Sequence, residues 1–479
     1  MTEENMKISV NNYGPIAEAK DIELCPLTVF VGPSNTGKSY LAILIYALLH
    51  SFQNRSSFAS RFRRKPKRQE TISFDSKAIE KELSLVEKLF KSDMENIKFS
   101  DLPEELQKWT NEEIAKAVNH KFCQELLRCM GISAKEDHLI SNNFNFNLED
   151  NQKSLILRSF DETPSLKIKE TDSVENMFAK SFIYKFYMFL EKEISREIKT
   201  KTEIKAWMFL DWISENIFHS DGKTESFYLP AARTGIMQSH RAIAGALVQR
   251  ATFAGIENFS VPTLSGIVSD FLEELILIDT SKIPDPAVGE VANEMEKEIL
   301  HGSIKSKSLE GNQYPQFSYK QNGLEVPLLC SSSMVSELTP VVLFIRHRVG
   351  KGDLLIIEEP EAHLHPEAQR NVAKTVVRLV RTGVRVMVTT HSDYFLDQLA
   401  NYVRLSKLSK AKRNKLADDQ NLFLKENEIG AYAFNRQEGG TIVERLHFDQ
   451  ENGLSPEDHD KVSSDLYNDT VELLDQLDQ

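Results

Sequence analysis

Continuous apolar runs mark two blocks that lie far apart in the chain. Leu27–Val31 is a run of β-forming residues typical of a strand buried on both faces of a mixed or parallel sheet. Leu354–Ile357 and Val384–Thr390 have the same character in the second block. The pattern predicts that these runs are strands of one sheet, although several hundred residues separate the second block from the first.

Helical periodicity follows the first two runs. Tyr40–Leu49 is an apolar helical segment, and a second helix is predicted from Pro366, which suits a first turn, to about Gly383. The apolar stripe of the second helix consists of Val372, Val376, Leu379 and Val380. A third helix is expected at Leu338–Val349. Residues 51–224 between the blocks predict a mainly helical lobe, and they lack the sustained heptads of long coiled-coil arms.

A glycine-rich sequence joins the first strand to the first helix. It consists of Gly32, Pro33, Ser34, Asn35, Thr36, Gly37, Lys38 and Ser39. A strand, this G-x-x-x-x-G-K-S spacing and a helix are the full context of a phosphate-binding loop. The two glycines let backbone N–H groups converge on phosphate oxygens at a helix N-terminus. Lys38 is expected to reach the β- and γ-phosphates of ATP, and the Ser39 hydroxyl to be a Mg²⁺ ligand.

Two carboxylates follow the Leu354–Ile357 strand directly. In open α/β sheets, ligands bind at the carboxyl ends of the strands, so Glu358 and Glu359 are expected at the nucleotide. We assign Glu358 to the metal side and Glu359 to the general base that deprotonates the attacking water. His391 follows the next strand and is predicted to contact the γ-phosphate or that water.

Composition narrows the class of protein. The net charge of −13 and the 27% of charged residues are typical of a soluble protein, so nucleic-acid binding would need a local basic patch. No apolar run is long enough to span a membrane, and the first residues lack a secretory signal. Four cysteines without a C-x-x-C pair argue against a disulfide scaffold or a zinc ribbon. We therefore expect a cytoplasmic protein.

These motifs resemble those of ABC-type ATPases of the SMC/OLD-like AAA ATPase group. Gly32–Ser39 is similar to the Walker A loop, Ile356–Glu359 to the Walker B strand and Pro360–Leu364 to the D-loop, and His391 resembles the switch histidine. The resemblance implies a P-loop NTPase fold of the α/β class, with an ABC-ATPase-like head, a mixed sheet flanked by helices and an inserted, mainly helical lobe. It also implies ATP and Mg²⁺ as cofactors. Glu358 departs from the aspartate of the wider ABC family.

The ABC signature is degenerate. Its candidate is Cys330–Glu337, which follows an Asn322–Gly323 hairpin turn and lacks the usual glycines. The resemblance implies that Ser332 or Ser333 reaches a nucleotide bound to a second copy of the chain. The alternative is that these serines cap a helix, and one serine can do both.

One further segment resembles this group. Tyr228–Gly235 has the sequence YLPAARTG, and its Arg233 is expected either to face the nucleotide pocket or to have a capping or scaffold role.

Four parts are predicted along the chain. Residues 1–50 and 225–450 form the ATPase head, residues 51–224 the inserted lobe, and residues 451–479 an acidic C-terminal helix. The last contains eight acidic residues from Glu457 onward against Lys461 alone, and we interpret it as a docking helix.

Two basic clusters interrupt the acidic balance. DNA, or another acidic partner, is a candidate ligand for both, and the alternative is that each is a solvated loop. The residues concerned are Arg61, Arg63 and Arg64 within Arg55–Arg68, and Lys407 and Lys412 within 407–415.

These observations lead to a predicted dimeric, ATP-driven switch. Since no acidic metal cluster like that of a Toprim nuclease follows His391, we expect a separate effector or nuclease subunit in a prokaryotic anti-phage defence system. The alternatives are a DNA-repair or DNA-end-processing ATPase, a transporter's nucleotide subunit, and a nucleotide-gated scaffold.

Overall fold

The computed structural model describes 6–51, 119, 122–132, 140–149, 153–158, 165–168, 224–239, 264–307, 316–416, 422–451, 453–454 and 457–477. The chain divides into two compact units. The first comprises 1–12, 47–126 and 140–224, and the second comprises 13–46, 127–139 and 225–479. The basic segment with Arg61, Arg63 and Arg64 lies outside the described residues.

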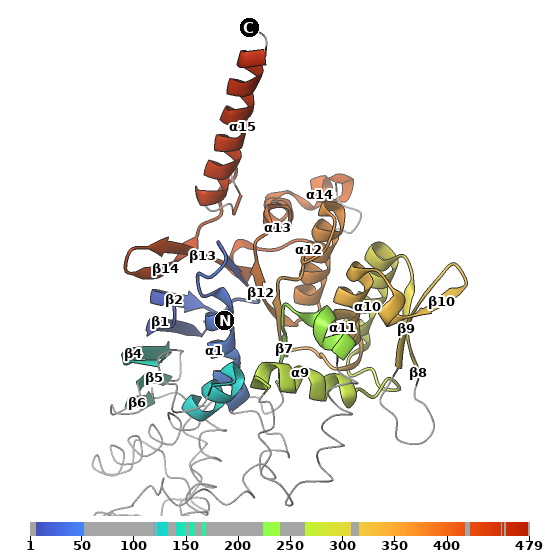
Figure 1. The fold of residues 1–479 in the computed structure, drawn as a ribbon, viewed down its shortest axis with the longest axis horizontal. Helices are drawn as coiled ribbons and strands as arrows, with labels where there is room; N and C mark the ends of the chain where they lie inside the picture. Colours follow the sequence, from blue (N-terminus) through green and yellow to red (C-terminus); the bar gives the residue numbers. More distant parts are fainter. Residues whose placement is uncertain are drawn as a thin grey trace, which may run out of the picture. The chain divides into compact units, whose positions relative to one another are not determined.

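The second unit is built on a mixed sheet in the order β2-β14-β13-β3-β12-β11-β7. Figure 1 labels its strands β2, β7, β12, β13 and β14. The strands are β2 (Ile16–Glu23), β3 (Leu27–Val31), β7 (Ser226–Leu229), β11 (Leu354–Glu358), β12 (Arg385–Thr390), β13 (Ile429–Gln437) and β14 (Gly440–Leu446). β3 pairs in parallel with both β12 and β13, and β11 pairs in parallel with both β12 and β7. The predicted α/β class, with the apolar runs as neighbours in one sheet, is confirmed.

Helices pack on this sheet because its strands are apolar on both faces. They are α1 (Lys38–Ser51), α9 (Gly266–Ile276), α10 (Pro286–Met295), α11 (Ser333–His347), α12 (Pro366–Arg381) and α13 (Asp393–Lys407). The short helix α14 (Lys410–Leu416) follows α13 in the chain. Val29, Leu355 and Val386 are fully buried in one core with side chains of α10 to α13. The parallel arrangement brings the carboxyl ends of β3, β7, β11 and β12 to one edge of the sheet.

α11 begins earlier than the sequence indicated. The predicted start at Leu338 was wrong, because the Ser332 side chain accepts a hydrogen bond from the backbone N–H of Val335 and starts the helix at Ser333. Ahead of it, the Asn322–Gly323 turn is confirmed. Both residues have a positive φ, of 50° and 82°, and they join β9 (Gln316–Gln321) to β10 (Leu324–Pro327). β8 (Ser303–Lys307) pairs with the other side of β9.

The first unit contains a small sheet in the order β6-β5-β4-β1. Its strands are β1 (Lys7–Tyr13), β4 (Ile140–Glu149), β5 (Lys153–Arg158) and β6 (Ser165–Ile168), and β4, β5 and β6 form an antiparallel meander. Phe146 of β4 stacks on Phe122, with ring centroids 5.5 Å apart.

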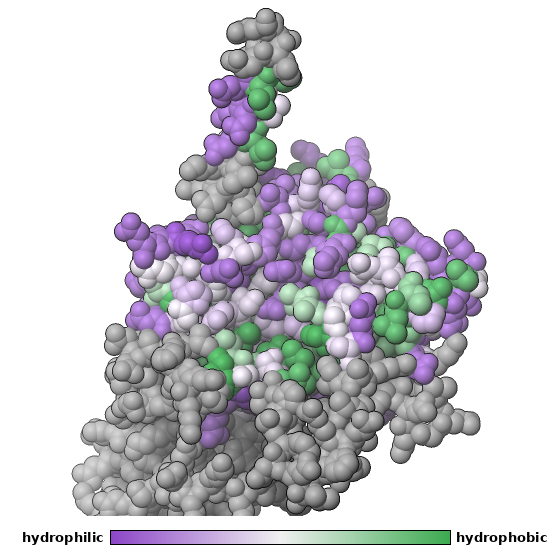
Figure 2. All heavy atoms as spheres, in the orientation of Figure 1, coloured by the Kyte–Doolittle hydropathy of each residue, from purple (hydrophilic) through white to green (hydrophobic). Residues whose placement is uncertain are grey.

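The acidic C-terminal segment forms helix α15 (Glu457–Leu477). Figure 2 shows apolar side chains along one side of it. The exposed apolar residues of α15 are Leu466, Tyr467, Val471, Leu473 and Leu474. Among the helices that the structure describes, none combines the length and apolar character needed to cross a membrane.

Candidate active site

The phosphate-binding loop connects the buried strand β3 to α1 at the edge where the parallel strands end. Gly32 and Gly37 have φ values of 142° and 100°, which residues with a Cβ rarely adopt. A Cβ on Gly32 would lie 2.8 Å from the carbonyl oxygen of Phe434, and one on Gly37 would lie 2.8 Å from Cγ1 of Ile16. The loop is therefore enclosed so tightly that both positions require glycine.

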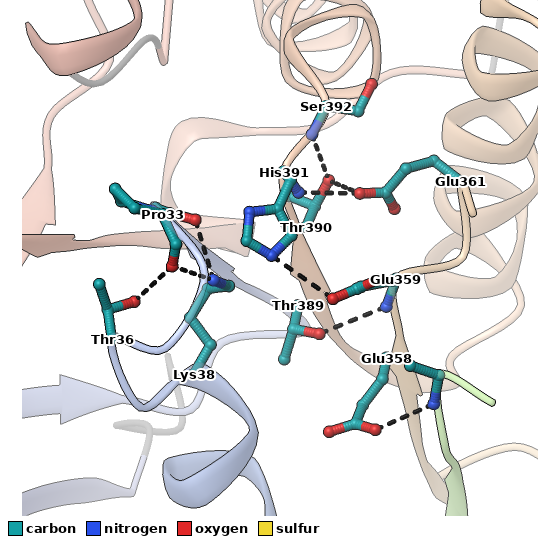
Figure 3. Close-up of polar contacts among 12 residues, drawn as sticks. Pro33, Thr36, Lys38, Glu358, Glu359, Glu361, Thr389, Thr390, His391 and Ser392 are labelled. Atoms are coloured by element: carbon teal, nitrogen blue, oxygen red, sulfur yellow. Dashed lines mark hydrogen bonds and ion pairs between the residues drawn. The ribbon is translucent and has the colours of Figure 1, made fainter. Parts of the chain in front are cut away.

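Lys38 lies across this loop. Its side chain is buried, and Nζ donates hydrogen bonds to the carbonyl oxygens of Gly32, at 2.9 Å, and Pro33, at 2.7 Å. Burial lowers the pKa of Lys38 to about 8, and the negative charges of Glu359, Glu361 and Glu358 oppose that shift. The lysine is thus held where phosphates would bind, with carboxylates on the opposite side (Figure 3).

The middle of the loop is exposed to solvent. Pro33, Ser34 and Asn35 are exposed, as is Ser39 in the first turn of α1. Thr36 is buried instead, and its hydroxyl donates to the carbonyl oxygen of Pro33 at 2.8 Å. The exposed backbone of the loop and the Ser39 hydroxyl are therefore open to a ligand, whereas Thr36 stabilises the loop from inside.

Glu358 is the last residue of β11 and is buried. One oxygen of its carboxylate accepts a hydrogen bond from the Tyr228 hydroxyl at 2.7 Å, and the other accepts from the backbone N–H of Ala231 at 2.9 Å. Burial and then the charge of Glu358 raise the pKa of Tyr228, so the tyrosine remains a donor. Each carboxylate oxygen keeps free acceptor capacity, which suits the water shell of a hard cation.

Glu359 and His391 face each other (Figure 3), and the Glu359 carboxylate lies 3.4 Å from Nε2 of His391. Glu359 has a φ of 41°, and its N–H donates to the carbonyl oxygen of Thr389 at 2.9 Å. The hydrogen bond from His391 lowers the pKa of Glu359, with a further contribution from the charge of Lys38. The side chain of Glu359 is 40% exposed, so an ionised carboxylate meets solvent beside the histidine.

Glu361 is a participant that the sequence analysis did not assign. It is buried, and its carboxylate accepts hydrogen bonds from the Thr390 hydroxyl at 2.6 Å and the backbone N–H of His391 at 2.8 Å. Burial raises the pKa of this carboxyl. Its place as the third carboxylate in a short run after a buried strand was the available signal. Glu361 fixes the backbone of His391 and thereby the direction of the imidazole.

Arg233 does not face the pocket. The alternative in which it contacts the nucleotide is wrong, because the side chain is fully buried and its guanidinium is bound by protein groups. It donates to the carbonyl oxygens of Pro230, Glu358 and Glu359, and it pairs with the Glu337 carboxylate at 2.8 Å. The scaffold role is the one that these contacts support.

The candidate signature serines lie elsewhere in the same unit. Ser332 and Ser333 are exposed at the N-terminus of α11, where Ser332 is the helix cap. The predicted capping role is therefore confirmed for Ser332.

The basic residues Lys407 and Lys412 lie outside the site. Nζ of Lys407 lies 3.1 Å from a carboxylate oxygen of Glu426 and 4.4 Å from the ring centroid of Phe448. Lys412 is an exposed residue of α14, which is a helix and not the surface loop considered above.

With this geometry in place, one comparison is decisive. Residues 6–396 match the family described as the AAA ATPase domain, and these residues include the loop, both glutamates and His391. The chain belongs to the AAA ATPase domain family. No match was found among curated proteins.

Solved SMC head domains are also similar to this AAA ATPase domain. The head from Thermotoga maritima is 10% identical and covers 93% of this chain and 100% of its own, with a TM-score of 0.35. An Smc head bound to the C-winged helix domain of ScpA is 11% identical, covers 93% and 98%, and has a TM-score of 0.37. A head with an extended coiled coil, bound to the C-terminal domain of ScpA from Pyrococcus furiosus, is 11% identical, covers 99% of both chains and has a TM-score of 0.34. The family and the strand order of the sheet show the α/β fold.

Proposed function

We propose that this protein binds Mg²⁺ and ATP at the edge formed by β3, β11 and β12 and hydrolyses ATP to ADP and phosphate. The observation that supports this most directly is the Glu359 carboxylate 3.4 Å from His391 Nε2, opposite the buried Lys38. A base for the attacking water, a lysine for the phosphates and a side chain that can orient the water are parts that recur in enzymes of phosphoryl transfer.

The roles follow from the placement of each group. Lys38 exchanges its two backbone carbonyl partners for phosphate oxygens, which are stronger acceptors because they are charged. Glu359 takes a proton from water, whose oxygen bonds to the γ-phosphorus as the bond to the ADP oxygen breaks. His391 orients that water or the γ-phosphate. Glu361 holds the backbone of His391 in position.

Mg²⁺ fits the oxygen donors at this edge. The Ser39 hydroxyl is exposed in the first turn of α1, and the Glu358 carboxylate is held from both sides by Tyr228 and Ala231. We assign Ser39 as a direct ligand and Glu358 as an acceptor for the metal's water shell. The metal supplies neutralisation of phosphate charge.

A homodimeric switch of the OLD-like type is part of the proposal. Ser332 and Ser333 are exposed at a helix N-terminus, which favours an anion, and this exposure supports a contact with the γ-phosphate on a second copy of the chain. ATP would then close the dimer, and hydrolysis would open it. The biological role we propose is control of a separate effector in a prokaryotic anti-phage defence system, and the exposed face of α15 supports a protein partner.

DNA binding is a second candidate function. The exposed lysines of α14, Lys410, Lys412 and Lys415, favour it. DNA-stimulated turnover that falls steeply with salt would support this candidate, and turnover unaffected by DNA would exclude it.

The replacement of Glu359 by glutamine tests the proposed hydrolysis. Because glutamine keeps the shape of the side chain but cannot accept the proton, Glu359→Gln should bind ATP normally and lose turnover by about 100-fold or more. Steady-state phosphate release and equilibrium binding of a labelled nucleotide measure the two effects, and light scattering reports an ATP-trapped dimer. Glu367→Gln, an exposed change in the first turn of α12, is the control. Normal turnover in Glu359→Gln would refute the assignment of the base.

A further inference from the structure

Arg233 lies between two parts of the ATPase that the chain supplies separately. It follows β7 and is 0% exposed, so its guanidinium makes all its contacts with protein groups. On one side is α11, which begins with the signature serines. On the other side is the end of β11, where the Walker B carboxylates stand. Its contacts join these two elements.

The contacts with α11 all reach one residue of that helix. The guanidinium pairs with the Glu337 carboxylate at 2.8 Å, and Nε donates to the Glu337 carbonyl oxygen at 3.3 Å. The neighbouring Thr234 adds a backbone N–H at 3.1 Å and its hydroxyl to the same carboxylate. Glu337 is buried, and its charge is opposed there by the arginine, a pairing that is costly to break. The first turns of α11 are thereby fastened to residues 233–234.

The contacts with β11 reach the backbone of the two Walker B glutamates. One terminal nitrogen of Arg233 donates to the carbonyl oxygen of Glu358, and the other donates to the carbonyl oxygen of Glu359 at 3.0 Å. Glu359 has a left-handed φ of 41°, which costs free energy in a residue with a Cβ and persists only where neighbours hold it. Its N–H is held by Thr389 and its carbonyl by Arg233.

We propose that Arg233 is a positioning residue that couples the placement of α11 to the orientation of Glu359, so that contacts at the N-terminus of α11 regulate hydrolysis. The inference rests on the proposed function, because it concerns the same base. Glu337 lies about one helical turn beyond Ser332 and Ser333, so a ligand that pulls on these serines moves Glu337 with them. Arg233 then transmits the shift to the carbonyl of Glu359. The N-terminus of α11 in each chain would thus contact the nucleotide of the second copy and also control the position of Glu359 in its own chain.

Hydrogen exchange tests the physical link without nucleotide. Lysine cannot reach all the partners of the arginine fork, so Arg233→Lys should raise amide exchange across residues 356–364 by about tenfold. Glu337→Gln, which keeps the shape of its side chain, should act in the same direction and serves if Arg233→Lys folds poorly. Arg378→Lys is the matched control, because Arg378 is a largely buried arginine that pairs with Glu294 and Glu298 outside the site. Unchanged exchange across 356–364 in both variants would overturn the link.

Kinetics test the regulatory consequence. Arg233→Lys should lower kcat by about 100-fold, because a small displacement of a base is sufficient, while the KM for ATP stays within about threefold. The double variant Arg233→Lys/Glu337→Gln should be no slower than the slower single variant, since both break one connection. A merely structural role would instead lower kcat in proportion to the unfolded fraction, as circular dichroism would show, and that result would overturn the proposal. Absence of turnover in the wild type would refute the proposed function, whereas unchanged exchange would refute the link alone.

Discussion

The two halves of the site are constructed differently. The Walker A half is one continuous stretch, from the end of β3 through the loop into α1, and the hydrogen bonds of Lys38 join residues at most six positions apart. The Walker B half is assembled from distant segments. Tyr228 and Arg233 come from the segment around β7, Glu337 from α11, and the glutamates from β11 and the turn after it.

The difference shows where each half gets its geometry. Backbone conformation at two glycines and short-range hydrogen bonds of Lys38 shape most of the Walker A loop, although β13 also packs against it through Phe434. Side chains from other elements orient both Walker B glutamates, since Tyr228 binds Glu358 and Arg233 holds the carbonyl of Glu359. A change within the loop should therefore act on nucleotide binding, whereas a change far along the chain can act on catalysis.

The largest effect is expected from a substitution that disrupts the Walker A half alone. Lys38→Ala removes the buried charge that would face the phosphates, so affinity for ATP should fall by about 100-fold or more. Isothermal titration calorimetry measures the loss, and circular dichroism should show an intact fold. Lys20→Ala, an exposed lysine on β2, is the control and should bind normally. Retained affinity in Lys38→Ala would remove this loop from the binding site.

A pH series sharpens the comparison, because Lys38 is the group through which the two halves interact electrostatically. Burial lowers its pKa to about 8, and bound phosphate favours the charged form. Affinity for ATP should therefore begin to fall near pH 8 and decrease by up to about tenfold per pH unit above it. Lys38→Arg stays charged throughout this range, so any ATP binding that it retains should not fall. A wild-type affinity that is flat from about pH 7 to 9.5 would contradict a lowered pKa at Lys38.

The smallest effect tests the dependence of the Walker B half on a distant segment. Tyr228→Phe removes the donor at 2.7 Å from Glu358, so the Mg²⁺ concentration for half-maximal turnover should rise by about tenfold. Turnover measured over a Mg²⁺ titration checks this. Tyr319→Phe is the control, because the Tyr319 hydroxyl donates to the Leu300 carbonyl oxygen away from the site. Tyr319→Phe should lose a comparable free energy of unfolding but keep the wild-type Mg²⁺ dependence of turnover. The same Mg²⁺ dependence in both variants would contradict the assigned role of Tyr228.

The Walker A half and the fold class could both be predicted from the sequence. The strand, the glycine spacing and the helix all lie within Leu27–Ser51, where residue type and order determine the conformation. Apolar runs identified β11 and β12 for the same reason. The placement of His391 and Glu359 at the same edge was expected from a general property of parallel sheets, whose carboxyl ends meet there, whereas their direct contact was not predicted.

The partners of the glutamates were not accessible in this way. Arg233 was noticed, but whether it faced the nucleotide or the scaffold depends on which carbonyls lie within its reach, and these belong to β11 and α11. Tyr228 was seen as part of a motif without a partner, since its pairing with Glu358 follows from the register of β7 on β11. Long-range register and side-chain direction have no local signature in one sequence.

The strand β13 beside β3 has a consequence for synthesis of the protein. Phe434 closes over Gly32, and Arg436 donates to the carbonyl oxygen of Ser34, 402 positions earlier in the chain. A ribosome adding about 5 to 20 residues per second needs roughly 20 to 80 seconds to cover that distance. During this interval the phosphate loop exists without its neighbours on either side, since β12 is also made late. The packing of Phe434 against Gly32 and the hydrogen bond from Arg436 can therefore form only after β13 has been synthesised.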